Sequence, residues 1–152
     1  MTRATLVTTM LYDEIDDPGE LTPEELRAQY VEELAEMVAS VGVDEVAMQT
    51  ELDRETVASL ADGDSPEITL EDAAAVLATG EDAPSKDAIL LEVRDHLLMG
   101  MTTGVLDVDT LASDIDSDLG PKAIQQKIEG RAPMTLEEYA LVHHYIAERN
   151  DR

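Results

Sequence analysis

The sequence predicts an all-α protein of about eight helices, arranged as two tandem four-helix units that pack together. Three observations carry this prediction: apolar residues recur at helical spacing, capping residues precede most of these segments, and one order of motifs occurs twice. Hydrophobic residues make up 43% of the 152 residues, so the chain can bury a core although its formal net charge is −25.

The chain divides into three regions. Residues 1–21 are rich in turn residues and are expected to form an irregular N-terminal lead-in, with Met10 as an alternative to Met1 for the start of translation. Residues 22–80 are expected to form the first unit, copy A, and residues 85–149 the second unit, copy B. The segment TGEDAPS at their junction has the composition of a linker.

Copy A begins with a long helix. Thr22 can cap it, because a proline and a glutamate follow at the first and third helical positions, and Gly42 is expected to end it. A short second helix follows, and Asp53 can cap a third one that Gly63 terminates. Thr69 and the aspartate three residues later offer a capping box for the fourth helix. The inward-facing residues of the first helix are expected to be Leu26, Tyr30, Leu34, Met37 and Val41.

Copy B repeats this layout. Ser85 can cap a long helix that ends at Gly104, and a short helix is expected to start at Val108. A glycine and a proline open the next helix, residues 121–129, which Gly130 stops, and the sequence TLEE then supplies a capping box for the last helix. The inward-facing residues of the first and last helices are expected to be Ile89, Leu90, Val93, Leu97, Met101, Tyr139, Val142, Tyr145 and Ile146.

The repeat is visible in three pairs of segments that occur in the same order. VDEVA (43–47) matches VDTLA (108–112), TVASLADG (56–63) matches AIQQKIEG (123–130), and ITLEDAAAVLA (68–78) matches MTLEEYALVHH (134–144). Unrelated amphipathic helices would not share the order, the glycine and the Thr-Leu-Glu start, so two copies of one unit are the economical interpretation.

Each copy resembles the helix-turn-helix of the phage-repressor (Cro/cI, XRE-like) family. That family places a turn and a short third helix ending in glycine after a second helix with an apolar-Ala pair, and then a Thr-Leu-Glu helix start. The matching residues are Val46, Ala47, Thr56, Val57, Leu60, Gly63, Pro66 and 69–71 in copy A, and Leu111, Ala112, Ile124, Ile128, Gly130, Arg131, Pro133 and 135–137 in copy B. The whole chain also resembles a small family of acidic haloarchaeal proteins of unassigned function.

The repressor resemblance implies that the third helix of each copy enters the major groove of duplex DNA. Glutamine can pair with adenine, and lysine or arginine with guanine or phosphate. The predicted function is therefore a DNA-binding transcriptional regulator that reads DNA mainly through the third helix of copy B. The residues that the resemblance assigns to this contact are Lys122, Gln125, Gln126, Lys127, Arg131 and Thr135.

Copy A gives a weaker set at the same positions. Arg54 and Ser59 are secondary candidates, but Glu55, Asp62 and Asp64 accompany them and would repel phosphates. Copy A is therefore expected to be mainly structural. The alternative function is a non-enzymatic helical adaptor with a degenerate helix-turn-helix, and the alternative for the basic residues of copy B is an ordinary solvated helix face. A homodimer or another protein partner is left open.

The charge pattern indicates adaptation to high salt. Acidic residues occur in every segment, lysine occurs only at Lys86, Lys122 and Lys127, and Phe, Trp and Cys are absent. At about 1 M salt the Debye length is about 3 Å, so repulsion between surface carboxylates is largely screened. An acidic partner-binding protein of an ordinary cytosol is the alternative. Because no apolar run approaches the length of a membrane span, we expect a cytoplasmic protein that does not contact a membrane.

No motif indicates an enzyme, a cofactor or a metal. The chain has no cysteine, glycine-rich phosphate loop or nucleophile elbow. The acidic run 114–118 is similar to the start of a calcium loop, but Leu119 stands where that loop needs glycine and Gln125 where it needs glutamate. His143 and His144 are adjacent, so on a helix they point in different directions and cannot share a metal ion. They are expected to be partly buried or surface histidines.

Overall fold

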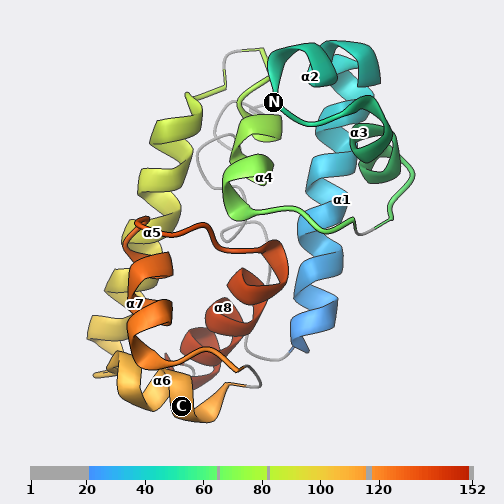
Figure 1. Ribbon diagram of the computed structural model, residues 1–152. Coiled ribbons are helices and arrows are strands. Elements are labelled where there is room, and N and C mark those ends of the chain that lie inside the picture. Colours follow the sequence, from blue (N-terminus) through green and yellow to red (C-terminus); the bar gives the residue numbers. More distant parts are fainter. Residues whose placement is uncertain (1–20, 65, 82, 116–117, 151–152) are drawn as a thin grey trace.

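The protein is all-α, as the sequence predicts. We describe residues 21–64, 66–81, 83–115 and 118–150 of a computed structural model, which contain eight helices and no strand (Figure 1). The helices are α1 (Pro23–Val41), α2 (Val43–Gln49), α3 (Arg54–Ala61), α4 (Leu70–Leu77), α5 (Lys86–Thr103), α6 (Val108–Asp114), α7 (Pro121–Ile128) and α8 (Leu136–Asn150). The predicted lead-in, apart from Leu21, and the choice between Met1 and Met10 lie outside the described residues.

The helix starts follow the capping residues. Thr22, Thr69 and Thr135 each accept a hydrogen bond from the amide three residues on, and the acid at that position accepts one from the threonine amide in return. Asp53 and Ser85 cap α3 and α5 through their side chains, so these predictions are confirmed. Gly63 and Gly130 follow α3 and α7 with φ of 85° and 83°, the left-handed conformation expected there.

The first half of the molecule, α1–α4, packs against the second half, α5–α8. Figure 1 shows α1 and α5 as two long outer helices, with α4 and α8 between them. α1 packs against α8, and α5 packs against α4, so the first helix of each half contacts the fourth helix of the other half. None of the described helices combines the length and the apolar character that a membrane-spanning segment needs.

An isolated antiparallel bridge joins the two halves at Thr69 and Thr135. The amide of Leu70 donates to the carbonyl of Met134 at 2.6 Å, and the amide of Leu136 donates to the carbonyl of Ile68 at 2.9 Å. The bonds are reciprocal, because each half supplies one donor and one acceptor from corresponding positions of the predicted repeat. The repeat itself stays a prediction.

The predicted inward-facing residues lie in one core that runs through both halves, with Met37 and Val41 at its margin. The sequence does not predict the buried ring cluster that joins α1, α5 and α8. His143, expected to be partly buried or at the surface, is only 2% exposed, and its Nδ1 lies 2.6 Å from the hydroxyl of Tyr30. The ring of Tyr139 stacks on that of His143 at 5.4 Å, and the ring of His96 meets it edge-on at 5.9 Å.

Burial and then the neighbouring His96 and His144 lower the pKa of His143 from 6.5 to about 3. Burial raises the pKa of the Tyr30 hydroxyl above its ordinary value. The imidazole is therefore neutral near pH 7, and it shares a hydrogen bond with the protonated Tyr30 hydroxyl whose direction depends on the tautomer of His143. This bond connects the first half to the second inside the core.

Candidate nucleic-acid interface

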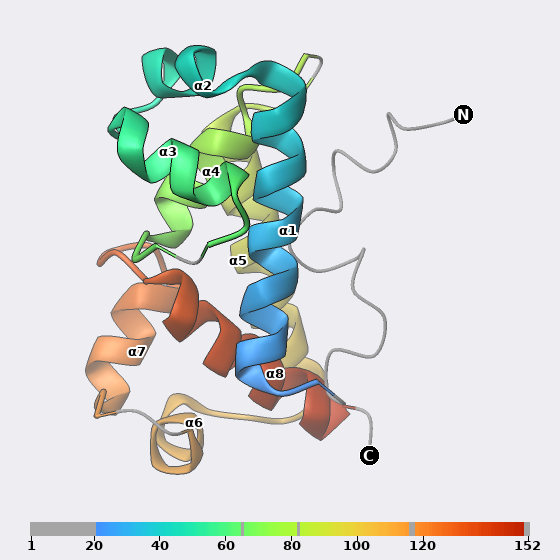
Figure 2. The same cartoon turned by 90° about the vertical axis from the view of Figure 1, so that its right-hand side faces the viewer.

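Helix α7 carries most of the residues expected to contact DNA. Ile124 and Ile128 are buried and hold one side of α7 against the core. Its opposite side faces outward, with Lys122 and Gln125 exposed. Figures 1 and 2 show that α7 and α3 lie on the same face of the molecule, which is turned to the viewer in Figure 1 and lies to the left in Figure 2.

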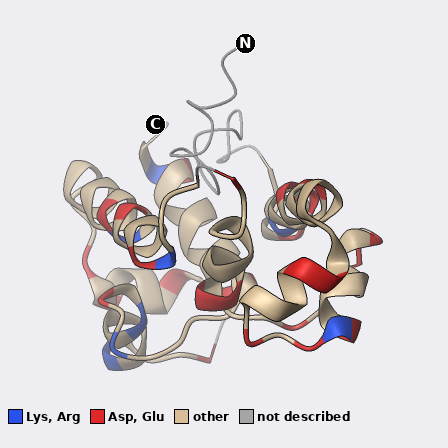
Figure 3. Ribbon diagram, turned by 90° about the horizontal axis from the view of Figure 1, so that it is seen from above, with Lys and Arg blue, Asp and Glu red and all other residues tan. Residues whose placement is uncertain are grey.

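The start of α7 differs in charge from the starts of the other described helices. Its first turn has no acidic residue, whereas each of the other helices that the structure describes has at least one there. Acidic residues otherwise occur on helices and loops throughout the described chain (Figure 3). Gly120 precedes α7 without a side-chain cap, so the positive end of the helix dipole is not neutralised by a carboxylate there.

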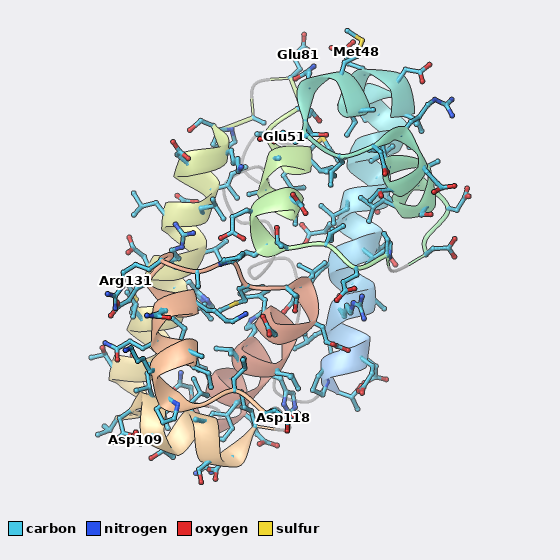
Figure 4. All side chains as sticks on the ribbon, in the orientation of Figure 1. Met48, Glu51, Glu81, Asp109, Asp118 and Arg131 are labelled. Atoms are coloured by element: carbon cyan, nitrogen blue, oxygen red, sulfur yellow. The ribbon has the colours of Figure 1, made fainter. Side chains whose placement is uncertain are left out.

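At the C-terminal end of α7, a positive charge is paired with a negative one. Arg131 projects from the loop after α7 (Figure 4), its side chain is 62% exposed, and its Nη2 lies 2.5 Å from Oε1 of Glu129. Gln125 donates a hydrogen bond of 3.0 Å to the other carboxylate oxygen of Glu129. The hydrogen bonds from Gln125 and then from Arg131 lower the pKa of Glu129, so this carboxylate stays charged beside the two candidates. Gln126 is half-buried, and its carbonyl accepts the amide of Arg131 at 2.8 Å.

Lys127 does not point toward solvent as the DNA assignment requires. Its ammonium donates to the carbonyl of Pro133 at 3.0 Å and to Oε1 of Glu138 at 2.8 Å, and its side chain is only 18% exposed. In the predicted repeat Lys127 corresponds to Leu60, which is fully buried in α3. The repeat therefore contains the signal that would have assigned Lys127 to the interior: its stem packs inward, and its charge is satisfied by the loop and α8.

Thr135 is also engaged within the chain. Its amide donates to Oε1 of Glu138 at 2.9 Å, and its hydroxyl oxygen accepts the amide of Glu138 at 3.0 Å. A phosphate would have to displace the capping carboxylate in order to reach that amide. Lys127 and Thr135 thus stabilise the junction of α7 and α8, which leaves Lys122, Gln125, Gln126 and Arg131 as the candidate interface.

The secondary candidates lie on α3. Arg54 is exposed, and its Nε donates to Oδ1 of Asp44 at 2.6 Å. Ser59 is half-buried, and its carbonyl accepts the amide of Asp64. Hydrogen bonds from the side chain and then the backbone of Thr56 lower the pKa of Asp53, which keeps a negative charge at the start of α3. The surface of α3 is therefore more acidic than that of α7.

A groove of about 550 Å³ between α6 and α8 was not anticipated from the sequence. On one wall, Oδ2 of Asp114 accepts hydrogen bonds from the Tyr145 hydroxyl at 2.6 Å and from Arg149 at 2.9 Å. The Arg149 guanidinium lies 4.8 Å from the centre of the Tyr145 ring, and His144 also lines the groove. Within the described ranges no three His, Asp or Glu side chains are grouped as metal ligands. The Tyr145 hydroxyl and Nη2 of Arg149 are thus bonded to Asp114, whereas Nε of Arg149 is buried without a hydrogen-bond partner.

The protein is thus all-helical in its described part. It has two four-helix halves, and α3 of the first half and α7 of the second lie on the same outer face. A protein-family model described as "Family of unknown function (DUF5791)" matches residues 26–149, and the chain belongs to this family. Comparisons with curated proteins and with solved structures give no match.

Proposed function

We propose that the protein is a non-enzymatic, DNA-binding transcriptional regulator of a high-salt cytoplasm, and that it contacts duplex DNA mainly through α7. The observation that carries this proposal is the acid-free first turn of α7, which bears the exposed Lys122 and is followed by the exposed Gln125. In a chain with a formal net charge of −25, such a turn is the part of the candidate interface that repels phosphate least.

The chemistry of the exposed side chains fits the edges of base pairs. Gln125 can pair with adenine, and Lys122 can reach guanine or a phosphate. To bind a phosphate, Arg131 would have to give up its ion pair with Glu129. This ion pair is exposed to solvent and therefore contributes little to stability. The helix dipole adds attraction for phosphate at the start of α7.

The relation between the halves supports two copies of one helix-turn-helix unit. The Thr69–Thr135 bridge is reciprocal, and each first helix packs on the fourth helix of the other half. Reciprocal contacts of this kind are typical of a two-fold interface. The proposal assigns base reading to α7 and leaves α3 as support, because Asp53 and Glu55 give α3 the wrong charge for phosphate.

High salt is part of the proposal. In dilute buffer the carboxylates around α7 would repel DNA, whereas at about 1 M salt the repulsion falls off within about 3 Å. The same salt weakens the attraction between cations and phosphates, because little is gained from counterion release. Short-range contacts with base edges would therefore contribute most of the affinity.

Fluorescence anisotropy with duplex genomic fragments in about 1 M KCl tests this proposal. We expect Lys122→Ala to weaken binding about fivefold or more, the loss of one contact to a base or phosphate. Lys86→Ala is the matched control, because Lys86 is also an exposed lysine in the first turn of a helix, and it should leave affinity unchanged. Equal effects of the two substitutions would assign the binding to general charge and would overturn the role of α7.

The alternative is a helical adaptor whose helix-turn-helix has lost its nucleic-acid role. The ion pair between Arg54 and Asp44 and the charge of Asp53 favour this alternative for the first half. If the wild-type protein binds no duplex fragment in the same salt, the regulator is excluded and the adaptor is favoured.

A further inference from the structure

Helix α5 exposes large apolar side chains that do not pack into the core. Leu91 is 61% exposed, Leu98 44% and Met99 66%. The spacing of seven residues puts Leu91 and Leu98 on the same side of the helix. Val105, just beyond the end of α5, is 90% exposed. We call these four residues the α5 stripe. Met101 lies in the core, as expected, whereas Met99, two residues earlier, belongs to the stripe.

The stripe is specific to α5. The exposed residues of α1, the first helix of the other half, are polar or small: Glu24, Glu25, Ala28, Gln29, Glu32, Glu36, Ala39 and Ser40. Figure 1 shows α5 along one side of the molecule, with α7 in front of its lower half and α1, α4 and α8 toward the other side. Within the described chain, nothing therefore accounts for leucine and methionine on this face, and exposed apolar patches of this kind mark interaction sites.

Val105 adds an independent observation. Its φ of 54° is a left-handed conformation that β-branched residues rarely adopt, and glycine would take it without strain. Since Val105 is almost fully exposed, its side chain gains little from packing within the described part of the chain. An apolar side chain held there at a conformational cost becomes useful if a partner covers it.

The stripe contains a carboxylate that defines the chemistry of the partner. Asp95 is exposed and lies four residues after Leu91 and three before Leu98, so it occupies the same side of α5. A partner that buries both leucines also removes this carboxylate from water. Burial of a charge is unfavourable unless a group of opposite charge meets it. The partner must therefore present a lysine or arginine amid its own apolar residues.

A second copy of this chain that docks through its own α5 stripe does not meet that requirement. On α5 the basic residues are Lys86 and Arg94, and Lys86 is the first residue of the helix, nine positions before Asp95. Arg94 pairs with Glu71 at 3.4 Å, is only 25% exposed, and packs over Gly130, where a Cβ atom would lie 2.5 Å from its Cζ. Two stripes would also bring Glu92 and Asp95 of both copies together in a chain that already carries a charge of −25.

We propose that the α5 stripe is the docking site for an amphipathic helix of another protein that carries a lysine or arginine within its apolar face. The leucines, Met99 and Val105 supply the apolar area, and Asp95 selects the cation. This site is separate from α7 and does not depend on DNA binding.

The test uses two synthetic amphipathic peptides that differ at one position of the apolar face, lysine in one and glutamate in the other. Isothermal titration calorimetry with the full chain is expected to show that the lysine peptide binds at least about tenfold more tightly. Asp95→Lys should reverse this preference. A preference that is unchanged in Asp95→Lys would overturn the proposal.

Two further variants distinguish binding at the α5 stripe from nonspecific binding to any exposed apolar side chain. Leu98→Ser is expected to weaken binding of the lysine peptide about tenfold, the loss typical of an apolar anchor at an interface. Met48→Ser is the matched control, because Met48 is 79% exposed but lies on α2 (Figure 4), and it should leave binding unchanged. Equal losses in both variants would overturn the site. A wild-type dimer in sedimentation equilibrium that Leu98→Ser abolishes would instead identify a second copy as the occupant.

Discussion

The two halves of the molecule place different chemistry at corresponding positions of the predicted repeat. Leu60 of α3 and Leu77 of α4 are buried leucines in the first half. Their counterparts in the second half are Lys127 and His143, which are also turned inward but need polar partners. The second half thus fills the same positions with hydrogen-bonded groups. Such groups contribute less to stability than leucine, but they tie α7 and α8 to specific neighbours.

The same comparison holds at the surface. Asp53 caps α3 with a carboxylate, whereas the corresponding Gly120 leaves the start of α7 without a side-chain cap. Corresponding helices of the two halves can therefore begin with either a charged or a neutral N-cap residue. The difference in cap, together with Lys122, is what distinguishes the two candidate interfaces.

The largest effect should come from the histidine that replaces a leucine. His143 has a pKa of about 3 in the folded chain against 6.5 when exposed, so the unfolded chain binds the additional proton between these values. The stabilising contribution of neutral His143 is therefore complete above pH 6.5 and is lost as the pH falls toward 3. We expect this one group to lower the free energy of unfolding by up to about 1.4 kcal/mol per pH unit.

Denaturant unfolding from pH 7 down to pH 5 measures this effect. His143→Leu, which restores the residue of the first half, should give a shallower pH dependence than wild type, whatever its stability at pH 7. His144→Gln is the control, because His144 is the adjacent but half-exposed histidine, and it should keep the wild-type slope. An identical slope in all three proteins would show that His143 is not buried as a neutral imidazole.

A smaller effect is expected at Lys127. Lys127→Ala removes a hydrogen-bonded ion pair whose side chains are 18% and 22% exposed, and we expect a loss of about 1–2 kcal/mol in the free energy of unfolding. The double substitution Lys127→Leu/Glu138→Gln imitates the leucine of the first half and keeps a capping side chain. Its stability should lie within about 0.5 kcal/mol of wild type.

Urea unfolding of these variants, together with their DNA anisotropy, decides the role of Lys127. If Lys127 acts inside the chain, the double variant keeps whatever DNA affinity the wild type has. A double variant that is stable but loses affinity as Lys122→Ala does would return Lys127 to the interface.

The sequence predicts the helices well because their determinants are local. Thr22, Asp53 and Ser85 act on amides three residues away, and helical spacing identifies the core face within each segment. The pairing of α1 with α8 and of α5 with α4 depends on residues far apart in the chain, and no local pattern carries it.

The candidate site could be predicted only in part. Lys122, Gln125 and Arg131 are exposed as expected, and for the two helical residues this follows from the spacing of Ile124 and Ile128. The residue type of Lys127 suggests a surface, whereas its alignment with a buried leucine indicates the interior, where its side chain is only 18% exposed. Its role in DNA binding stays a prediction. The contacts of Asp114 with Tyr145 and Arg149 span 31 and 35 residues, and no local sequence pattern around Asp114 predicts them.

The smallest effect on stability, and the most direct test of the two helix starts, comes from giving α7 the cap of α3. Gly120 has φ −83° and ψ 171°, and a Cβ atom added there meets nothing within 4 Å, so Gly120→Asp can adopt the geometry of Asp53. The new carboxylate should cap α7 and raise the free energy of unfolding by only a few tenths of a kcal/mol.

The same carboxylate should weaken DNA binding, because it neutralises the helix start and repels phosphate. We expect the slope of log affinity against log salt to become shallower by about 0.9 if one phosphate contact is lost. The reverse change, Asp53→Gly, should leave DNA binding unaltered, because Glu55 still gives α3 an acidic first turn. Unfolding curves and anisotropy over a salt series measure both effects. A gain in stability with unchanged DNA affinity in Gly120→Asp would mean that the start of α7 does not face the duplex.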